Sequence, residues 1–191
     1  SEPLVLQIGG IGVALQRQYE QILKSERELR ELVPAQGRLE EAAAGWIRQL
    51  DPGSGLRWDD QNNLNKLDAG MKEQAAAQAE LRGRTAVIAR EMDEGAATVR
   101  LSLGMLADTE MVRCIRILET VPTRENPQAM RATLGEARLT QQRIVRSLRE
   151  LFEQFVQFRQ DWELAHMVSF TRMLAERQDR MRAESLTYAG L

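Results

Sequence analysis

The sequence predicts an all-α protein: an elongated antiparallel bundle of three long helices with a small helical appendage. Three observations lead to this prediction. An apolar seam at alternating 3- and 4-residue spacing runs through the last third of the chain, no segment shows the period-2 alternation of a strand, and the loops are short. Long helices joined by short loops must turn back on one another.

The seam is the longest pattern in the chain, and only one of its positions is polar. Its positions are Met130, Leu134, Ala137, Gln141, Ile144, Leu148, Leu151, Phe155, Phe158, Trp162 and Ala165. A repeat close to 3.5 residues indicates one face of a long helix against a partner helix. No proline follows Pro127, so we expect one helix over residues 128–186, on the order of 90 Å long.

The first long helix is predicted over residues 4–33 and ends at Pro34, because the residue before a proline is pushed out of the α region. A short helix over residues 36–50 follows, and then the loop signal Asp51-Pro52-Gly53-Ser54-Gly55. We therefore expect a single domain over residues 1–191, in which residues 34–60 form a small appendage between the first and second long helices.

Asp59 or Asp60 is expected to cap the next helix, since a carboxylate accepts hydrogen bonds from free amides at a helix start. The helical pattern then continues to residue 121, with polar residues at some seam positions: Gln74, Gln78 and Thr85. Gly95 and Asp108-Thr109 are candidate breaks, so this segment is one long helix or two. Residues 121–127 form a loop, because two prolines five apart cannot lie inside a helix.

Composition is ordinary for a soluble protein and argues against a general nucleic-acid binder. The 191 residues are 28% charged and 43% hydrophobic, with a formal net charge of −2. A nucleic-acid binder normally carries a basic face. The apolar stretch over residues 3–15 is too short to span a bilayer and lacks the basic start of a signal peptide. We therefore expect a soluble chain without a membrane span, as in the mature form of an exported protein.

The side chains that carry chemistry are few. Cys114 is the only cysteine and His166 the only histidine, so they form the single conceivable nucleophile–base pair, and packing is the simpler role for both. With no second histidine, no metal site is predicted. The acidic pairs Glu40-Glu41 and Asp59-Asp60 are typical of a solvated face or a helix cap. We therefore predict no enzyme and no catalytic, cofactor-binding or metal-binding residue.

Two groups in the last helix have a structural and a functional interpretation. The aromatic residues are typical of a core, although part of the group could reach a partner: Phe152, Phe155, Phe158, Trp162 and Phe170. The arginines near the end alternate with acidic residues, which is typical of a solvated helix end: Arg172, Arg177, Arg180 and Arg182.

Three segments resemble the minor-pilin family of type IV secretion and conjugal DNA-transfer systems, over about two thirds of the chain. The first is Gln18-Tyr19-Glu20-Gln21-Ile22-Leu23, similar to a Gln-rich stretch in the family's first helix. The second is Arg116-Ile117-Leu118-Glu119 leading into Glu125-Asn126-Pro127-Gln128-Ala129-Met130, similar to the loop that opens the family's last long helix. The third comprises Gln141-Gln142-Arg143-Ile144 and the segment over residues 174–180, similar to the body and end of that helix.

The resemblance implies a three-helix elongated bundle with a smaller helical appendage, and a non-enzymatic structural or adhesive role in a type IV secretion or conjugation apparatus. It implies contacts with the major pilin or with secretion scaffold subunits, and a periplasmic or pilus-associated location after removal of a signal peptide. The sequence does not determine whether the protein forms an oligomer. The alternative is a periplasmic ligand-sensing or partner-binding bundle domain cut from a larger protein. For partner binding, the sequence favours residues 4–13, which are apolar but weakened as a helix by Gly9, Gly10 and Gly12.

Overall fold

The computed structural model describes residues 2–55, 57–58 and 60–189, with side chains described for residues 13–55, 57–58, 60–169, 171–172, 175–176, 178–179 and 181–182. Helix makes up 93% of the structure, and no strand occurs among the described residues. The all-α prediction is therefore confirmed.

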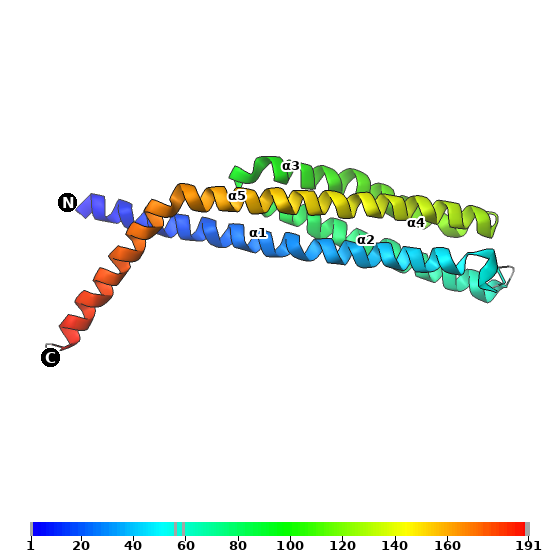
Figure 1. Cartoon of the computed structure of the whole chain (residues 1–191), viewed down its shortest axis with the longest axis horizontal. Helices are drawn as coiled ribbons and strands as arrows, with labels where there is room; N and C mark the ends of the chain where they lie inside the picture. Colours follow the sequence, from blue (N-terminus) through cyan, green and yellow to red (C-terminus); the bar gives the residue numbers. More distant parts are fainter. Residues whose placement is uncertain (1, 56, 59, 190–191) are drawn as a thin grey trace.

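Four helical rods run side by side in alternating directions (Figure 1). The rods are α1 (Glu2–Gln49), α2 (Gln61–Glu91), a composite of α3 (Ala97–Leu106), the π-helical turn η3 (Ala107–Met111) and α4 (Val112–Thr120), and α5 (Pro127–Ala189). The first rod packs against both α2 and α5, and the α3–α4 rod packs against the same two helices. The described chain thus places a fourth rod beside the three long helices that the sequence predicted.

The predicted end of the first helix at Pro34 is wrong, because α1 continues through this residue. A proline inside a helix removes a backbone donor and clashes with the preceding turn, which costs about 3 kcal/mol. The buried face of α1 is nevertheless continuous across this position: Leu29, Leu32, Gln36 and Ala43. Packing of this face outweighs the local penalty. Residues 34–49 therefore extend the first rod and do not form a separate helix of an appendage.

Two acidic side chains fix the ends of α2. Asp60 caps its start, with its Oδ1 accepting a hydrogen bond from the Asn62 amide at 2.9 Å, as one of the two predicted caps. Beyond its end, Asp93 Oδ1 accepts from the Gly95 amide at 2.8 Å and holds the short turn η2 (Glu94–Ala96). The candidate break at Gly95 is therefore real, and it separates α2 from α3.

The other candidate break, Asp108-Thr109, is not a loop. These two residues lie in η3, where the helix widens into a π turn without interruption, a feature found mostly as a single turn inside an α-helix. The predicted loop before the last helix is present, and it contains the turn η4 (Val121–Thr123). Asn126 then caps α5, with its Oδ1 accepting from the Ala129 amide at 2.9 Å.

The core follows the predicted seam of α5 over most of its length. Every seam position from Met130 to Phe155 is buried, Phe158 is partly buried, and Trp162 is 7% exposed. The prediction fails at Ala165, which is exposed. The orange-to-red end of α5 turns away from the body of the molecule, as Figure 1 shows. The seam thus ends just past the turn between α2 and α3, where Gly95 lies against Phe158.

Candidate binding surfaces

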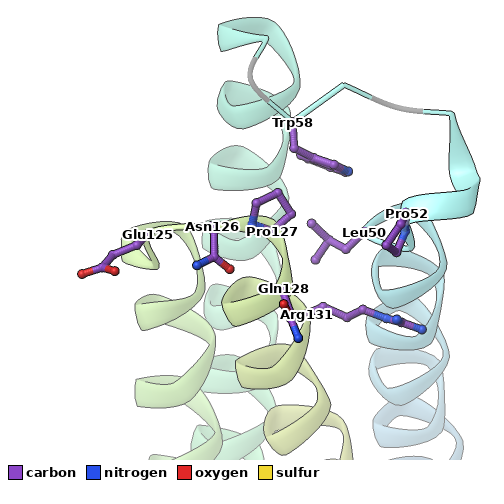
Figure 2. A pocket seen from close by; sticks show the side chains of 8 residues that line it. All are labelled: Leu50, Pro52, Trp58, Glu125, Asn126, Pro127, Gln128 and Arg131. Atoms are coloured by element: carbon purple, nitrogen blue, oxygen red, sulfur yellow. The ribbon is translucent and has the colours of Figure 1, made fainter.

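A hollow of about 920 Å³ opens at the end of the bundle where the α1–α2 and α4–α5 connections meet. It is lined by Leu50, Pro52, Trp58, Glu125, Asn126, Pro127, Gln128 and Arg131. Figure 2 shows Leu50, Trp58 and Pro127 turned toward the same space, while the Glu125 carboxylate points away from it. The hollow therefore has an apolar floor and a polar rim.

Local hydrogen bonds hold the two connections around this hollow. Asp51 accepts from the Gly53 amide at 3.1 Å and also pairs with the Arg131 guanidinium at 2.7 Å, which ties the first connection to α5. Gly55 ends the first turn with φ of 74°, a left-handed conformation that glycine adopts without strain. The Trp58 indole N–H donates to the Gln49 carbonyl at 3.3 Å. These contacts fix the shape of the hollow.

One member of each acidic pair named from the sequence has a structural partner. Glu40 Oε1 accepts from Arg138 at 2.6 Å and from Gln142 at 2.9 Å, which joins α1 to α5. Burial alone would raise the pKa of the Glu40 carboxyl, but the two hydrogen bonds outweigh it and leave the pKa below its usual range. Glu41 is exposed, Asp60 is the cap described above, and Asp59 lies outside the described residues. Glu40 is thus an ionised bridge between helices.

An aromatic stack lies at the opposite end of the bundle. The rings of Tyr19 and Trp162 stack with centroids 5.6 Å apart and an 8° angle between planes, and His166 lies over the same indole at 4.2 Å. His166 Nδ1 is 2.8 Å from the Trp162 carbonyl, one helical turn earlier. The expectation that Trp162 is a core residue is confirmed by its burial.

Beside the stack, a network of charges joins α1 to α5. Arg159 pairs with Glu26 at 2.5 Å and with Glu163 at 2.6 Å, and the Tyr19 hydroxyl donates to Glu163 at 2.8 Å. That hydrogen bond, with burial, raises the pKa of Tyr19. Burial opposes ionisation of Glu163, but the hydrogen bonds from Tyr19 and Arg159 outweigh it and lower its pKa. The network stabilises the last layer before α5 leaves the body.

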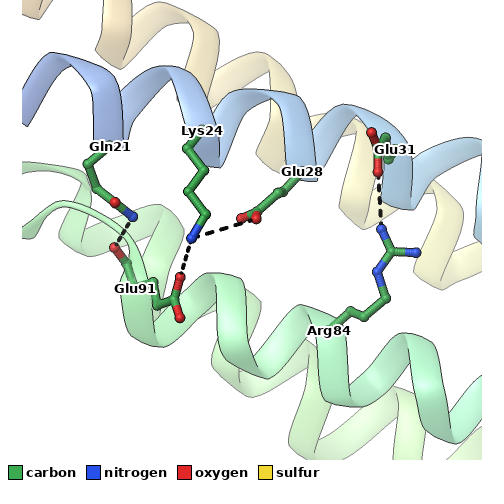
Figure 3. Close-up of polar contacts among 6 residues, drawn as sticks. All are labelled: Gln21, Lys24, Glu28, Glu31, Arg84 and Glu91. Carbon is green, nitrogen blue, oxygen red and sulfur yellow. Dashed lines mark hydrogen bonds and ion pairs between the residues drawn. The ribbon is translucent and has the colours of Figure 1, made fainter.

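Polar contacts also join α1 to the end of α2 (Figure 3). Lys24 pairs with Glu91 at 2.7 Å and lies 3.9 Å from Glu28, and Arg84 pairs with Glu31 at 3.2 Å. All of these groups are substantially exposed, so each pair contributes little to stability. They orient the two helices without forming a ligand site.

Beyond the stack, α5 carries apolar side chains that are largely exposed. Leu164 is 65% exposed, Met167 55% and Val168 75%. The spacing i, i+3, i+4 places the three on one face of the helix. We call this the arm patch, and the part of α5 beyond Trp162 the arm.

Other residues from the sequence interpretation are placed as follows. Phe155 is buried, and Phe152 is partly buried with the Arg30 guanidinium 5.7 Å from its ring centre. Arg172 and Arg182 are exposed. The side chains of Phe170, Arg177 and Arg180 lie outside those described, as do the side chains of residues 4–12 in the proposed N-terminal binding segment. Val13, the last residue of that segment, is 51% exposed.

Cys114 and His166 are far apart. The Cys114 sulfur lies in the core, 3.7 Å from the Gln78 Oε1 and 3.9 Å from the Ala137 carbonyl oxygen. Ala137 and His166 are both on α5, and 1.5 Å per residue separates them by about 40 Å. Burial raises the pKa of the Cys114 thiol to about 12, with a smaller effect from Glu110. The two residues therefore cannot form a catalytic pair.

Sequence reasoning missed one group of core residues, the buried glutamines. Gln74, Gln78 and Gln141 could be noticed as polar interruptions of apolar seams, but their partners could not. The burial of Gln36 could not be predicted, because this residue follows Pro34, where the helix was expected to end. All four side chains are buried in the structure.

No group of three His, Cys, Asp or Glu side chains comes together as a metal site within the described part of the chain. Among the residues that the structure describes, no helix combines the length and apolarity that a membrane crossing requires. No protein-family model matches the chain, and neither a curated protein nor a solved structure matches it.

Proposed function

We propose that the chain is a non-enzymatic structural or adhesive component of a bacterial type IV secretion or conjugation apparatus, comparable to a minor pilin, and that it acts through protein–protein contacts. In this proposal it works in the periplasm or on the pilus after removal of a signal peptide. Its partners are the major pilin or scaffold subunits. The arm is the contact surface.

The observation that carries this proposal is the arm patch. Three large apolar side chains, each more than half exposed, lie together on a helix that has left the body of the molecule: Leu164, Met167 and Val168. A contiguous exposed apolar patch marks a surface that another molecule covers, whereas single exposed apolar residues are normal. An amphipathic helix of this kind commonly lies in the groove of a partner protein.

The all-helical, elongated build of the molecule is compatible with the comparison with minor pilins. The appendage expected over residues 34–60 is not a separate helix, because residues 34–49 extend α1, and the α3–α4 rod is a fourth rod beside the three long helices. The arm lies at the end of the bundle opposite the Trp58 hollow (Figure 1). A component of this shape can contact different subunits at its two ends.

The test is a set of polar substitutions in the full gene, expressed in the bacterium that carries it. The variant Leu164→Ser, Met167→Gln and Val168→Ser should fold with an unchanged melting temperature, because exposed substitutions usually change stability by less than about 0.5 kcal/mol. It should be lost from the sheared pilus fraction. The readout is an immunoblot of that fraction and of the cell pellet.

The matched control is Leu101→Ser with Met105→Gln, because these side chains are 64% and 68% exposed but lie on α3. The control should remain in the pilus fraction at the wild-type level. If the arm variant also remains there, the arm is not the contact surface. If wild-type protein never enters the pilus fraction, the secretion proposal is wrong.

The alternative function is a periplasmic ligand-sensing or partner-binding bundle domain. One observation favours it: α1 and α5 lie next to each other and both leave the four-rod body at the same end (Figure 1). Segments joined to either helix would emerge together, as a receptor requires. This alternative predicts that the full-length protein fractionates with the inner membrane, whereas the first proposal predicts the periplasmic and pilus fractions.

A further inference from the structure

A band of polar side chains crosses the interior of the bundle at its middle. All four rods contribute to it, with Gln36 from α1, Gln78 from α2, Cys114 from α4 and Gln141 from α5, each 0% exposed. The rods share this level because the Cys114 sulfur touches both Gln78 and the Ala137 carbonyl, and Ala137 lies one turn before Gln141. Gln74, 6% exposed, lies one turn before Gln78 on α2.

The glutamines of this band fall into two classes. Gln36 and Gln78 satisfy each other, since each amide nitrogen donates to the other's Oε1 at 2.8 Å. Gln74 and Gln141 differ, because neither the Nε2 nor the Oε1 of either side chain makes a hydrogen bond to a protein group. Buried side-chain amides nearly always have hydrogen-bond partners, because an unpaired one loses its hydration without replacement.

We propose that Gln74 and Gln141 each bind internal water molecules, so that the middle of the bundle is a hydrated polar layer. Water suits both atoms of an amide, because it donates to the Oε1 and accepts from the Nε2. The side chains of the band are amides and a thiol, and none is ionised. An inorganic ion would find no opposite charge among them, and a neutral hydrogen-bonding molecule fits their chemistry.

This layer has a consequence for the fold. Apolar side chains along a helix face pack in more than one register, whereas a buried polar position restricts the pairing to arrangements that satisfy it. The Gln36–Gln78 pair and the hydrated Gln74 and Gln141 thus select the level at which the four rods align. Replacing these four glutamines with leucine should keep the helices but allow the rods to pack in more than one alignment.

The test compares two leucine variants with a control by oxygen-17 magnetic relaxation dispersion, which counts long-lived internal waters, and by crystallography. Gln74→Leu and Gln141→Leu should each lose the signal of at least one long-lived water molecule, without a fall in melting temperature. In the wild-type crystal, water oxygens should lie within hydrogen-bond distance of both amides. Gln141→Met is a second variant with a closer side-chain shape.

The control is Gln78→Leu, which leaves the amide of Gln36 without its partner. It should lower the melting temperature and should not reduce the count of internal waters. The proposal is overturned if the leucine variants at positions 74 and 141 keep the wild-type count of long-lived waters. It is also overturned if the wild-type crystal shows both amides bonded directly to protein groups, in which case these variants should lose stability as Gln78→Leu does.

Discussion

Gly70 on α2 lies against the indole ring of Trp46 on α1. A Cβ added to this glycine would come 2.2 Å from Cζ2, 2.8 Å from Cε2 and 3.1 Å from Cη2 of Trp46. These atoms belong to a rigid ring, and contacts under 3.0 Å essentially never occur, so the indole must leave its place. We therefore predict that Gly70→Ala destabilises the protein.

The expected size follows from two opposed contributions. A buried aromatic side chain covers roughly 150–250 Å², and Trp46 is partly buried, so displacing it re-exposes about 100 Å², worth about 2.5 kcal/mol at 25 cal/mol per Å². Alanine is favoured over glycine inside a helix by about 0.8–1 kcal/mol. The net loss is about 1.5 kcal/mol, or roughly 3–6 °C in melting temperature for a chain of this size.

Gly83 in the same helix is the matched control, because a Cβ there meets nothing within 4 Å. Gly83→Ala should raise stability by about 0.8–1 kcal/mol. Both variants are measured by urea unfolding followed by circular dichroism at the helix band. In a Trp46→Ala background the clash is removed, so Gly70→Ala should become stabilising there. If Gly70→Ala already behaves like Gly83→Ala in the wild-type background, the indole is not held against Gly70 and the reasoning is wrong.

Three further predictions concern single side chains. Trp162→Ala should cost about 3–5 kcal/mol in the same unfolding assay, because the ring is a buried partner of the Tyr19 stack, and an unchanged midpoint would place it outside the core. The folded state lowers the pKa values of Glu40 and Glu163 below the usual 4.5, so the stability they contribute is fully present above that pH and is lost as the pH falls through the folded values. Urea midpoints measured between about pH 6 and pH 3 should fall less steeply in the Glu40→Gln, Glu163→Gln double variant than in the wild type. The Cys114 thiol, with its pKa raised to about 12, should not react with a disulfide reagent at about pH 8 until urea unfolds the chain, and rapid labelling of the folded protein would contradict its burial.

The sequence predicts the long α5 well because its signal is repeated many times. From Met130 to Trp162 each apolar position supports the same helix face, and no single residue decides the result. Pro34 shows the opposite case. The local rule for proline is correct as a penalty, but the sequence does not show that the face on both sides of it packs against α2 and α5. Tertiary packing then decides, and local reasoning fails.

The candidate surfaces were less predictable than the helices. The hollow lined by Trp58 forms only because the α1–α2 and α4–α5 connections, which are far apart in sequence, meet in the structure. The Asp51–Arg131 ion pair that ties the first connection to α5 cannot be recognised from neighbouring residues in the sequence. The partner of Glu40 is 98 residues away on α5, so its bridging role could not be distinguished from that of a solvated carboxylate. Caps were easier to predict, because Asp60 acts on an amide two residues along the chain.

The end of the seam at Trp162 explains why the arm differs from the rest of α5. The turn between α2 and α3 lies beside the Tyr19 end of the core, because Gln18 Nε2 donates to Asp93 at 2.9 Å. Neither α2 nor α3 therefore extends past this turn to cover α5. The next seam position, Ala165, is exposed, and the large apolar residues shift to Leu164, Met167 and Val168. A helix face that faces solvent normally carries mostly polar residues. An isolated helix is also only marginally stable in water, so a long arm gains stability from being covered. The shifted apolar face is therefore not an extension of the core seam, and under the proposed function it is the surface that a partner covers.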